Sequence, residues 1–149
     1  MIIETSFGPA WAAISSSGAL EAFGFGEANG RARGHSPLLA AQVREYCLGK
    51  RQSFDLEMNP AGSEFQKRVW TELGRIPYGQ TISYSQLADR VGISGAARAV
   101  GRANATNPIA LVIPCHRVIG SNGALTGYAY GTDLKKQLLD WESRIAARP

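Results

Sequence analysis

A short apolar run bracketed by two prolines is the feature of this sequence that most constrains its fold. Five apolar residues, Ile109 to Ile113, follow one another without a polar break, between Pro108 and Pro114. A run of this length between turn signals predicts a fully buried strand, although a buried helical segment would have the same periodicity. Neither proline can donate a backbone hydrogen bond, so both are expected at the ends of the element.

Three chemically active side chains follow the second proline directly. They are the thiol of Cys115, the imidazole of His116 and the guanidinium of Arg117. Reactive groups often lie on a loop that a rigid element holds, so this position favours a functional site. The two cationic neighbours supply the electropositive setting that a reactive thiolate needs. The alternative is that Cys115 is a buried core cysteine, as most free cysteines are.

The geometry between the thiol and the imidazole depends on the backbone. Adjacent residues of an extended chain point to opposite faces. His116 can therefore act on Cys115 only if the chain turns at Pro114, or if a water carries the proton between them. Both routes are consistent with the sequence.

The stretch around the thiol forms a longer motif with residues on both sides of it. Its members are Asn107-Pro108, Pro114-Cys115-His116-Arg117-Val118, Gly123 and Gly127-Tyr128. This motif resembles the active-site segment of the O6-alkylguanine-DNA alkyltransferases, in which the cysteine takes an alkyl group from a damaged base. The similarity covers about residues 62 to 145, and residues 1 to 58 match only in length and layout.

Length and composition are those of an ordinary globular protein. A chain of 149 residues can bury a core and form one or two small domains. It has no apolar run of membrane-spanning length, and its first residues lack the basic region of a signal peptide. Two cysteines make no disulfide framework, which indicates a reducing compartment and predicts a cytoplasmic protein without membrane contact. The cysteines and histidines show no zinc spacing, so we expect no metal.

Positive charge is concentrated in the second part of the chain. Residues 1–59 carry five basic and six acidic side chains, whereas residues 60–149 carry eleven basic and six acidic. No carboxylate occurs between Asp89 and Asp133. This carboxylate-free stretch contains four arginines, Arg90, Arg98, Arg102 and Arg117. The pattern favours an anionic partner, with nucleic acid first, over chance clustering of four arginines.

The first 58 residues predict an N-terminal α/β domain with a short antiparallel sheet. Strands are expected over residues 2–5, 10–15 and 19–25, and residues 54–56 are a weaker strand candidate. Ser36 and Pro37 begin a helix that Gly49 ends. The apolar face of this helix is expected to place Cys47 in the core.

Residues 59–149 predict a mostly helical C-terminal domain. Ser63 with Gln66, and Ser83 with Gln86, have the spacing of capping boxes, and each pair is expected to begin a helix. The first helix is expected to bury four residues, Phe65, Val69, Trp70 and Leu73.

The second capping box begins a predicted helix-turn-helix. A helix over residues 84–91 is joined by a glycine-containing turn to a helix over about residues 96–105, as that motif requires. Arg98 and Arg102 lie four residues apart and share a face of the second helix, where they would either meet DNA or be solvated. Gly101 lowers the helix preference by about 1 kcal/mol relative to alanine, which predicts a packing or contact reason for it.

The resemblance gives the second helix of this motif a specific task. It implies that the helix lies in the minor groove of DNA, and that Arg98, beside Ala97, fills the space left by an extruded base. Base extrusion itself follows from the chemistry, because the target atom is inaccessible inside a stacked duplex.

Residues 126–131 are predicted to form a flexible aromatic loop, because glycines here permit close approach of the backbone to a ligand. The resemblance implies that this loop closes over the flipped base, with the Ala129 amide near the base oxygen. Tyr130 stands where many family members have glycine, so it is expected to narrow the pocket. The resemblance assigns base binding to Tyr84, Val118, Tyr128 and Ala129. The Tyr84 phenol would donate to the ring of the base, and the Val118 carbonyl would accept from its exocyclic amine.

The last helix is expected to begin near Thr132 or Asp133, either of which can cap it. Its core residues are predicted to be Leu134, Leu138, Trp141 and Ile145. Glu142 lies at the edge of that face, where a half-exposed glutamate is the ordinary interpretation and a buried one needs a partner. The resemblance favours the buried one, because the family has a glutamate 27 residues beyond the cysteine, and 142 − 115 = 27.

The relay implied by the resemblance runs from Cys115 through a water to His116 and Glu142. Glu142 would orient the imidazole, and His116 would draw the proton from the thiol. Asn107 would stabilise the turn between the preceding helix and the apolar run; the alternative is that it merely stops the helix.

These features together predict a DNA-repair enzyme. The Cys115 thiolate would take the alkyl group of O6-alkylguanine, and secondarily of O4-alkylthymine, from double-stranded DNA. It would act once per molecule, as a monomer and without any cofactor. One alternative is a non-catalytic binder of alkylated DNA, although the alkyltransferase-like proteins carry another residue in place of the cysteine. The other is a Cys-His hydrolase, which would need repeated turnover and an oxyanion hole.

Overall fold

A computed structural model describes residues 1–149 and divides into two compact units. The first contains Met1–Ala61 and Pro108–Val112, and the second contains Gly62–Asn107 and Ile113–Pro149. The predicted class, a small antiparallel sheet followed by a mostly helical part, is confirmed. Residues 59–61 and 108–112, which were expected in the C-terminal domain, belong to the first compact unit.

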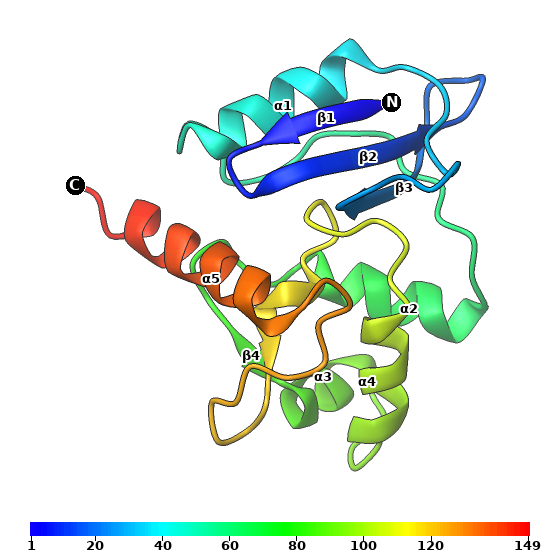
Figure 1. Ribbon diagram of the computed structural model, residues 1–149. Coiled ribbons are helices and arrows are strands. Elements are labelled where there is room, and N and C mark those ends of the chain that lie inside the picture. The colour runs from blue at the N-terminus through cyan, green and yellow to red at the C-terminus, as the bar shows by residue number, and fades with distance from the viewer. The chain divides into compact units, whose positions relative to one another are not determined.

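The first unit is built on a three-stranded antiparallel sheet of order β1-β2-β3, drawn in blue in Figure 1. Its strands are β1 (Ile2–Thr5), β2 (Gly8–Ile14) and β3 (Leu20–Phe25), close to the predicted ranges. In register, Ile3 lies opposite Ala10, and Ala12 lies opposite Phe23. The central strand is buried from Ala10 onward, so the sheet forms the core of this unit.

Helix α1 (Pro37–Cys47) begins and ends as its sequence signals predict. Ser36 Oγ accepts a hydrogen bond from the backbone amide of Leu39 at 3.1 Å, which caps the first turn. The buried residues of its apolar face include Leu39, Val43 and Tyr46. Cys47 is only half-buried, so its assignment to the core was wrong, because it lies at the edge of that face in the last turn.

Residues 54–56 form no strand, because a side chain from α1 takes the place of a strand partner. Gln42 donates from Nε2 to the carbonyl of Asp55 at 3.0 Å and accepts from the amide of Asp55 at 2.9 Å. Both backbone hydrogen-bonding groups of Asp55 are therefore satisfied without a neighbouring strand.

The apolar run of residues 109–113 is largely buried but is not a strand. It makes one isolated bridge to β3, in which the Phe23 amide donates to the Pro108 carbonyl and the Ala110 amide donates to the Phe23 carbonyl. Leu111 then bends the chain away with a φ of +68°. The strand prediction was wrong because only Ile109 pairs with β3. The residues after it are largely buried but have no strand partner.

The second unit contains four helices and a short two-stranded parallel sheet. Its elements are α2 (Glu64–Leu73), β4 (Ile82–Ser83), α3 (Tyr84–Val91), α4 (Ala97–Ala105), the 3-10 turn Cys115–Arg117, β5 (Val118–Ile119) and α5 (Thr132–Ala146). Both predicted capping boxes are present, and α3, a glycine-containing turn and α4 form the predicted helix-turn-helix. Phe65 is half-buried, unlike the other three predicted core residues of α2. None of the helices has both the length and the apolar composition that crossing a membrane requires.

Helix α5 presents a different face to the core from the one predicted. Leu134 and Trp141 are half-buried, and the buried residues are Lys135, Leu138, Glu142 and Ile145. The helix is thus rotated so that one ammonium and one carboxylate lie inside. Its N-cap position is Gly131 and makes no side-chain cap, so the predicted capping by Thr132 or Asp133 was also wrong.

Candidate active site

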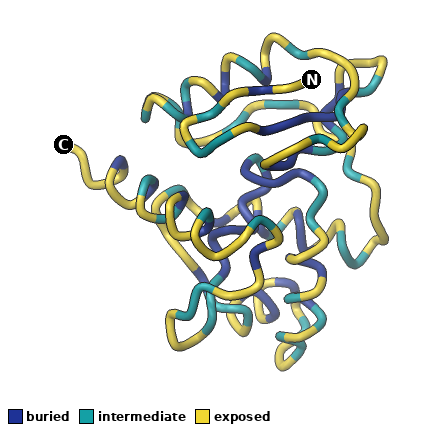
Figure 2. The backbone as a smooth tube through the Cα atoms, viewed as in Figure 1, coloured by how far each residue is buried: buried dark blue, intermediate teal, exposed yellow.

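The chain turns sharply at the position of the thiol. Cys115, His116 and Arg117 form a 3-10 turn, in which the Arg117 amide donates to the Pro114 carbonyl at 3.0 Å. Of the two routes left open by the sequence, the turning backbone is therefore the one observed. Asn107 braces the approach to this turn, because its Nδ2 donates to the carbonyl of Ile113 at 2.9 Å. Residues 113–118 are all buried, the class that Figure 2 colours dark blue along the chain.

The Cys115 thiol is buried, with 6% of the residue exposed, rather than partly exposed as a reactive thiolate would be expected to be. Burial raises its pKa, and this outweighs the opposing effects of the Asn107 side chain, the Lys135 ammonium and nearby backbone amides. At neutral pH the group is accordingly a thiol. A nucleophilic role then requires a neighbouring base that removes the proton during the reaction.

The His116 imidazole is held by one ring nitrogen and open at the other. Nε2 lies 2.8 Å from Oε2 of Glu142, and both side chains are buried. A carboxylate only accepts hydrogen bonds, so the hydrogen is on Nε2. Nδ1 is buried and has no protein partner. Burial lowers the pKa of His116 despite the opposing effect of Glu142, so the ring is neutral and can accept a proton at Nδ1.

The Arg117 guanidinium pairs with the Glu142 carboxylate. Its Nε donates to Oε1 at 2.7 Å and its Nη2 to Oε2 at 3.0 Å, while Nη1 donates to the carbonyl of Ile76 at 2.8 Å. Its charge is paired with this carboxylate, and the cation that lowers the pKa of the Cys115 thiol is Lys135. Although burial raises the pKa of Glu142, contacts with His116 and Arg117 lower it to about 2. The carboxylate is ionised throughout the neutral range.

Lys135 is a member of the site that the sequence reasoning missed. Its Nζ donates to the carbonyls of Val118, at 2.6 Å, and Thr126, at 2.8 Å, and the side chain is buried. Burial lowers its pKa, against the opposing influence of a Cys115 thiolate. A signal was present in the sequence, because Lys135 and Glu142 are seven residues apart and share a helix face. Burial of the glutamate implies burial of the lysine.

Tyr84 connects the helix-turn-helix to the loop after the thiol. Its hydroxyl donates to the carbonyl of Thr126 at 3.1 Å. Burial raises the pKa of this phenol, and a Cys115 thiolate raises it further, so the hydroxyl is a hydrogen-bond donor close to the sulfur. Gly127 has a φ of +76°, and a Cβ there would lie 3.0 Å from the Tyr84 hydroxyl. A side chain at position 127 is therefore disfavoured both by the positive φ and by the close approach of the Tyr84 hydroxyl.

The remaining residues assigned to base binding are partly brought together. Tyr128 is buried, and burial raises the pKa of its phenol, with a further increase from a Cys115 thiolate. The centroids of the Tyr128 and Tyr130 rings lie 5.7 Å apart, edge to face. The Val118 carbonyl, expected to accept from a bound base, already accepts from Lys135, although a carbonyl oxygen has a second lone pair. Ala129 is exposed on the loop and is the one member that lies outside the buried cluster.

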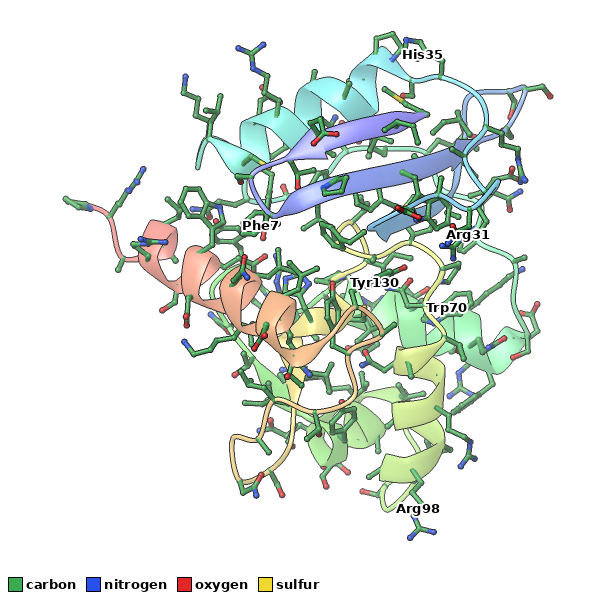
Figure 3. All side chains as sticks on the ribbon, viewed as in Figure 1. Phe7, Arg31, His35, Trp70, Arg98 and Tyr130 are labelled. Carbon is green, nitrogen blue, oxygen red and sulfur yellow. The ribbon has the colours of Figure 1, made fainter.

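Helix α4 exposes both of its arginines on one stripe. Arg98 and Arg102 are exposed, Ala97 is half-buried, and Figure 3 shows Arg98 extending from the helix into solvent. The buried side packs on α2, where Trp70 Nε1 donates to the carbonyl of Ala103 at 2.8 Å. The helix has no side-chain cap and no acidic residue in its first turn, so its positive field is uncompensated.

The predicted reason for Gly101 is not found inside the chain. A Cβ at this position would lie 3.6 Å from the Tyr84 ring, which is an ordinary contact. This distance shows that the Gly101 side of α4 faces the Tyr84 ring. Helix α4, Tyr84 and Cys115 all belong to the second unit.

Residues 64–144 match the family profile described as 6-O-methylguanine DNA methyltransferase, DNA binding domain. A methylated-DNA–protein-cysteine methyltransferase of Mycolicibacterium paratuberculosis is 55% identical over 103 residues, which is 69% of this chain and 62% of the relative. The protein of the same name from Methanosarcina acetivorans is 54% identical over 101 residues, 68% of this chain and 65% of the relative. The matches therefore span less than two thirds of these curated relatives.

Similarity to a solved structure extends over nearly the whole chain. The crystal structure of Mycobacterium tuberculosis OGT in complex with DNA superposes with a TM-score of 0.89 at 41% identity. It covers 97% of this chain and 92% of that one. The fold likeness therefore includes the first 58 residues, for which the sequence resemblance was confined to length and layout.

Proposed function

Because this chain belongs to the 6-O-methylguanine DNA methyltransferase family, we propose that it repairs DNA by transferring the alkyl group of O6-alkylguanine to Cys115. The observation that carries the proposal is the buried thiol on a tight turn that also holds His116 against an ionised Glu142. The helix-turn-helix that supplies Tyr84 to this site gives a route to DNA. The M. tuberculosis neighbour was solved in complex with DNA, which supports the same partner.

The chemical step is a displacement at the alkyl carbon. The Cys115 proton passes through a water to Nδ1 of His116, and the resulting thiolate forms a bond to the alkyl carbon as the bond from that carbon to guanine O6 breaks. The electron pair leaves with guanine, and a hydrogen bond from the Tyr84 hydroxyl stabilises the leaving group. The product is a thioether that thiol exchange cannot reverse, so each molecule reacts once.

The same proposal specifies how the lesion reaches the thiol. The alkylated base is extruded from the duplex, because the reacting carbon is inaccessible in the stack. Arg98 fills the space that it leaves, Arg102 contacts the duplex beside it, and the loop with Tyr128 and Ala129 covers the base. O4-alkylthymine is proposed as a secondary substrate. The protein is proposed to act as a monomer in the cytoplasm, where a free thiol stays reduced.

The direct test is an intact-mass and peptide-mass measurement after mixing with a duplex that contains one O6-methylguanine. We expect one methyl group on the Cys115 peptide, saturating at one equivalent. Cys115→Ala should gain no mass, and Cys47→Ala, which changes the other cysteine, should react as the parent does. Tight binding without mass gain would support the non-catalytic binder. Turnover of a thioester without DNA would support the hydrolase.

Arg98→Ala is expected to slow transfer from duplex DNA about tenfold or more, because extrusion of a paired base costs a few kcal/mol that the arginine helps to offset. Transfer from free O6-methylguanine base should be unchanged, since no extrusion is needed. Single-turnover rates on both substrates measure this, with Arg144→Ala on α5 as the control. Equal slowing on both substrates would contradict a role in extrusion.

Tyr130→Gly is expected to raise the rate with O6-benzylguanine about tenfold relative to O6-methylguanine. The Tyr130 ring packs edge to face on Tyr128, whose phenol pKa is raised by burial and further by a Cys115 thiolate, so removal of the Tyr130 ring opens space for a larger alkyl group. Tyr130→Phe keeps the ring and should retain the parent's ratio of the two rates. An unchanged ratio in the glycine variant would show that Tyr130 does not bound the pocket.

A further inference from the structure

We infer that Arg117 is a positioning residue that keeps His116 neutral by neutralising the carboxylate on which the imidazole rests. The inference deepens the proposed function and rests on it, because it assigns the form in which the proton acceptor waits for the thiol. The hydrogen bonds of the Arg117 side chain go to Glu142 and to the Ile76 carbonyl. Arg117 acts through Glu142.

The guanidinium occupies Glu142 more completely than the imidazole does. Oε1 accepts from Arg117 Nε at 2.7 Å, whereas Oε2 is shared between Arg117 Nη2 at 3.0 Å and His116 Nε2 at 2.8 Å. The third guanidinium nitrogen is tied to the carbonyl of Ile76 at 2.8 Å. With all three nitrogens engaged and the residue buried, the guanidinium is held on the carboxylate.

This arrangement determines the net charge of the site when His116 is protonated. Arg117 and Glu142 already form a neutral pair, so a second proton on the imidazole would add a net positive charge to a buried site. Lys135 supplies another positive charge to the same cluster. The protonated ring would also carry a hydrogen on Nδ1, where no protein acceptor is present. The neutral ring is therefore favoured on both counts.

Removal of Arg117 would reverse this preference. Glu142 would then be a buried anion whose nearest available compensation is a proton on His116, because an uncompensated buried charge is costly. The imidazole would then already carry a proton on Nδ1 and could not accept the proton of the Cys115 thiol. The titratable and charged groups that face the pair are Cys115 and Arg117 on the turn, Lys135 on α5, Tyr78 after α2 and Tyr128 on the loop.

The geometry of His116 separates this role from a merely structural one. An arginine that only braced the fold would change stability and leave the protonation of the ring alone. An arginine that controls the ring must change the pH at which His116 gains a proton. In a plot of the transfer rate against pH, the acid limb is the range in which the rate falls because His116 becomes protonated. Since loss of Arg117 is expected to raise the pKa of His116, this limb should move to higher pH.

The experiment compares Arg117→Met, which removes the charge, with Arg117→Lys, which keeps it. Nitrogen chemical shifts of His116 in the DNA-free protein report the protonation state and tautomer directly. We expect a neutral ring with hydrogen on Nε2 at pH 7 in the parent and in Arg117→Lys, and a doubly protonated ring in Arg117→Met. The acid limb of single-turnover methyl transfer should move up by about one pH unit or more in Arg117→Met, with partial or full rescue by lysine.

Each outcome bears on the inference. A folded Arg117→Met protein with neutral His116, or with an unmoved acid limb and only a lower plateau, would overturn it. If Arg117→Met does not fold, titration of the parent decides, because a His116 that gains its proton at or above pH 6.5 is incompatible with the inference. Absence of methyl transfer by the parent at every pH would instead contradict the proposed function. The nitrogen shifts of His116 would still test the effect of Arg117 on its protonation.

Discussion

Glu142→Gln is expected to slow alkyl transfer about a hundredfold and to lower the free energy of unfolding by about 3–5 kcal/mol. The carboxylate accepts three hydrogen bonds, two from Arg117 and one from His116, and all three residues are buried. Glutamine retains the shape but not the charge, so the guanidinium is left as an uncompensated buried cation. The same change replaces one of the two acceptor oxygens by an NH2 donor, so the donors of Arg117 and His116 can no longer all be satisfied and the orientation of the imidazole is weakened.

Two measurements separate these effects. Denaturant unfolding gives the change in stability, and the single-turnover rate with an O6-methylguanine duplex gives the change in reactivity at a temperature where both proteins are folded. Asp140→Asn is the matched control, because this carboxylate is exposed on the same helix and pairs only with Lys136. It should change stability by less than about 1 kcal/mol and leave the rate unaltered. A Glu142→Gln protein that reacts at the parent's rate would show that His116 is not the base.

Lys135→Met is expected to slow transfer about tenfold or more and to destabilise the fold by about 1–3 kcal/mol. The ammonium donates to the carbonyls of Val118 and Thr126, and it is close enough to Cys115 to stabilise a thiolate. Methionine fills a similar volume without a donor or a charge. The rate should fall because each unit of increase in the pKa of the thiol costs about tenfold in thiolate.

The neighbouring lysine provides the control for this prediction. Lys136 is exposed and pairs with Asp140 one turn along α5, so Lys136→Met should be close to neutral in both measurements. A second readout is the rate at which Cys115 reacts with iodoacetamide as a function of pH. Its midpoint should rise in Lys135→Met and stay in place in Lys136→Met. An unchanged midpoint, together with an unchanged transfer rate, would contradict the assigned role of Lys135.

Local signals accounted for most of the fold. The capping boxes at Ser63 and Ser83 correctly began α2 and α3, because a cap depends only on residues three positions apart. The antiparallel strands and the turn into α4 were likewise predictable from neighbours in the chain. The apolar run of residues 109–113 was not, since hydrophobicity predicts burial but does not determine how the backbone is paired.

Chemistry at the site was predictable in part. The spacing and resemblance brought Cys115, His116, Glu142 and Asn107 to one region, and the structure places them in one unit, while their catalytic roles stay predictions. The partner of Arg117 was missed because the direction of a side chain on a 3-10 turn depends on α5, which is distant in sequence. Buried charges depend on such long-range pairing, which no periodicity reports.

The chain passes between the two units three times, at residues 61/62, 107/108 and 112/113. The segment of residues 108–112 completes the core of the first unit at the edge of β3, yet it lies directly between α4 and the turn that holds the thiol. A shortened protein beginning at residue 62 would keep Ile109 and Leu111 but lose the strand beside which they are buried. That segment leads directly into the turn that holds Cys115, so we expect loss of the first unit to loosen the approach to the thiol, even though none of the proposed catalytic groups belongs to that unit.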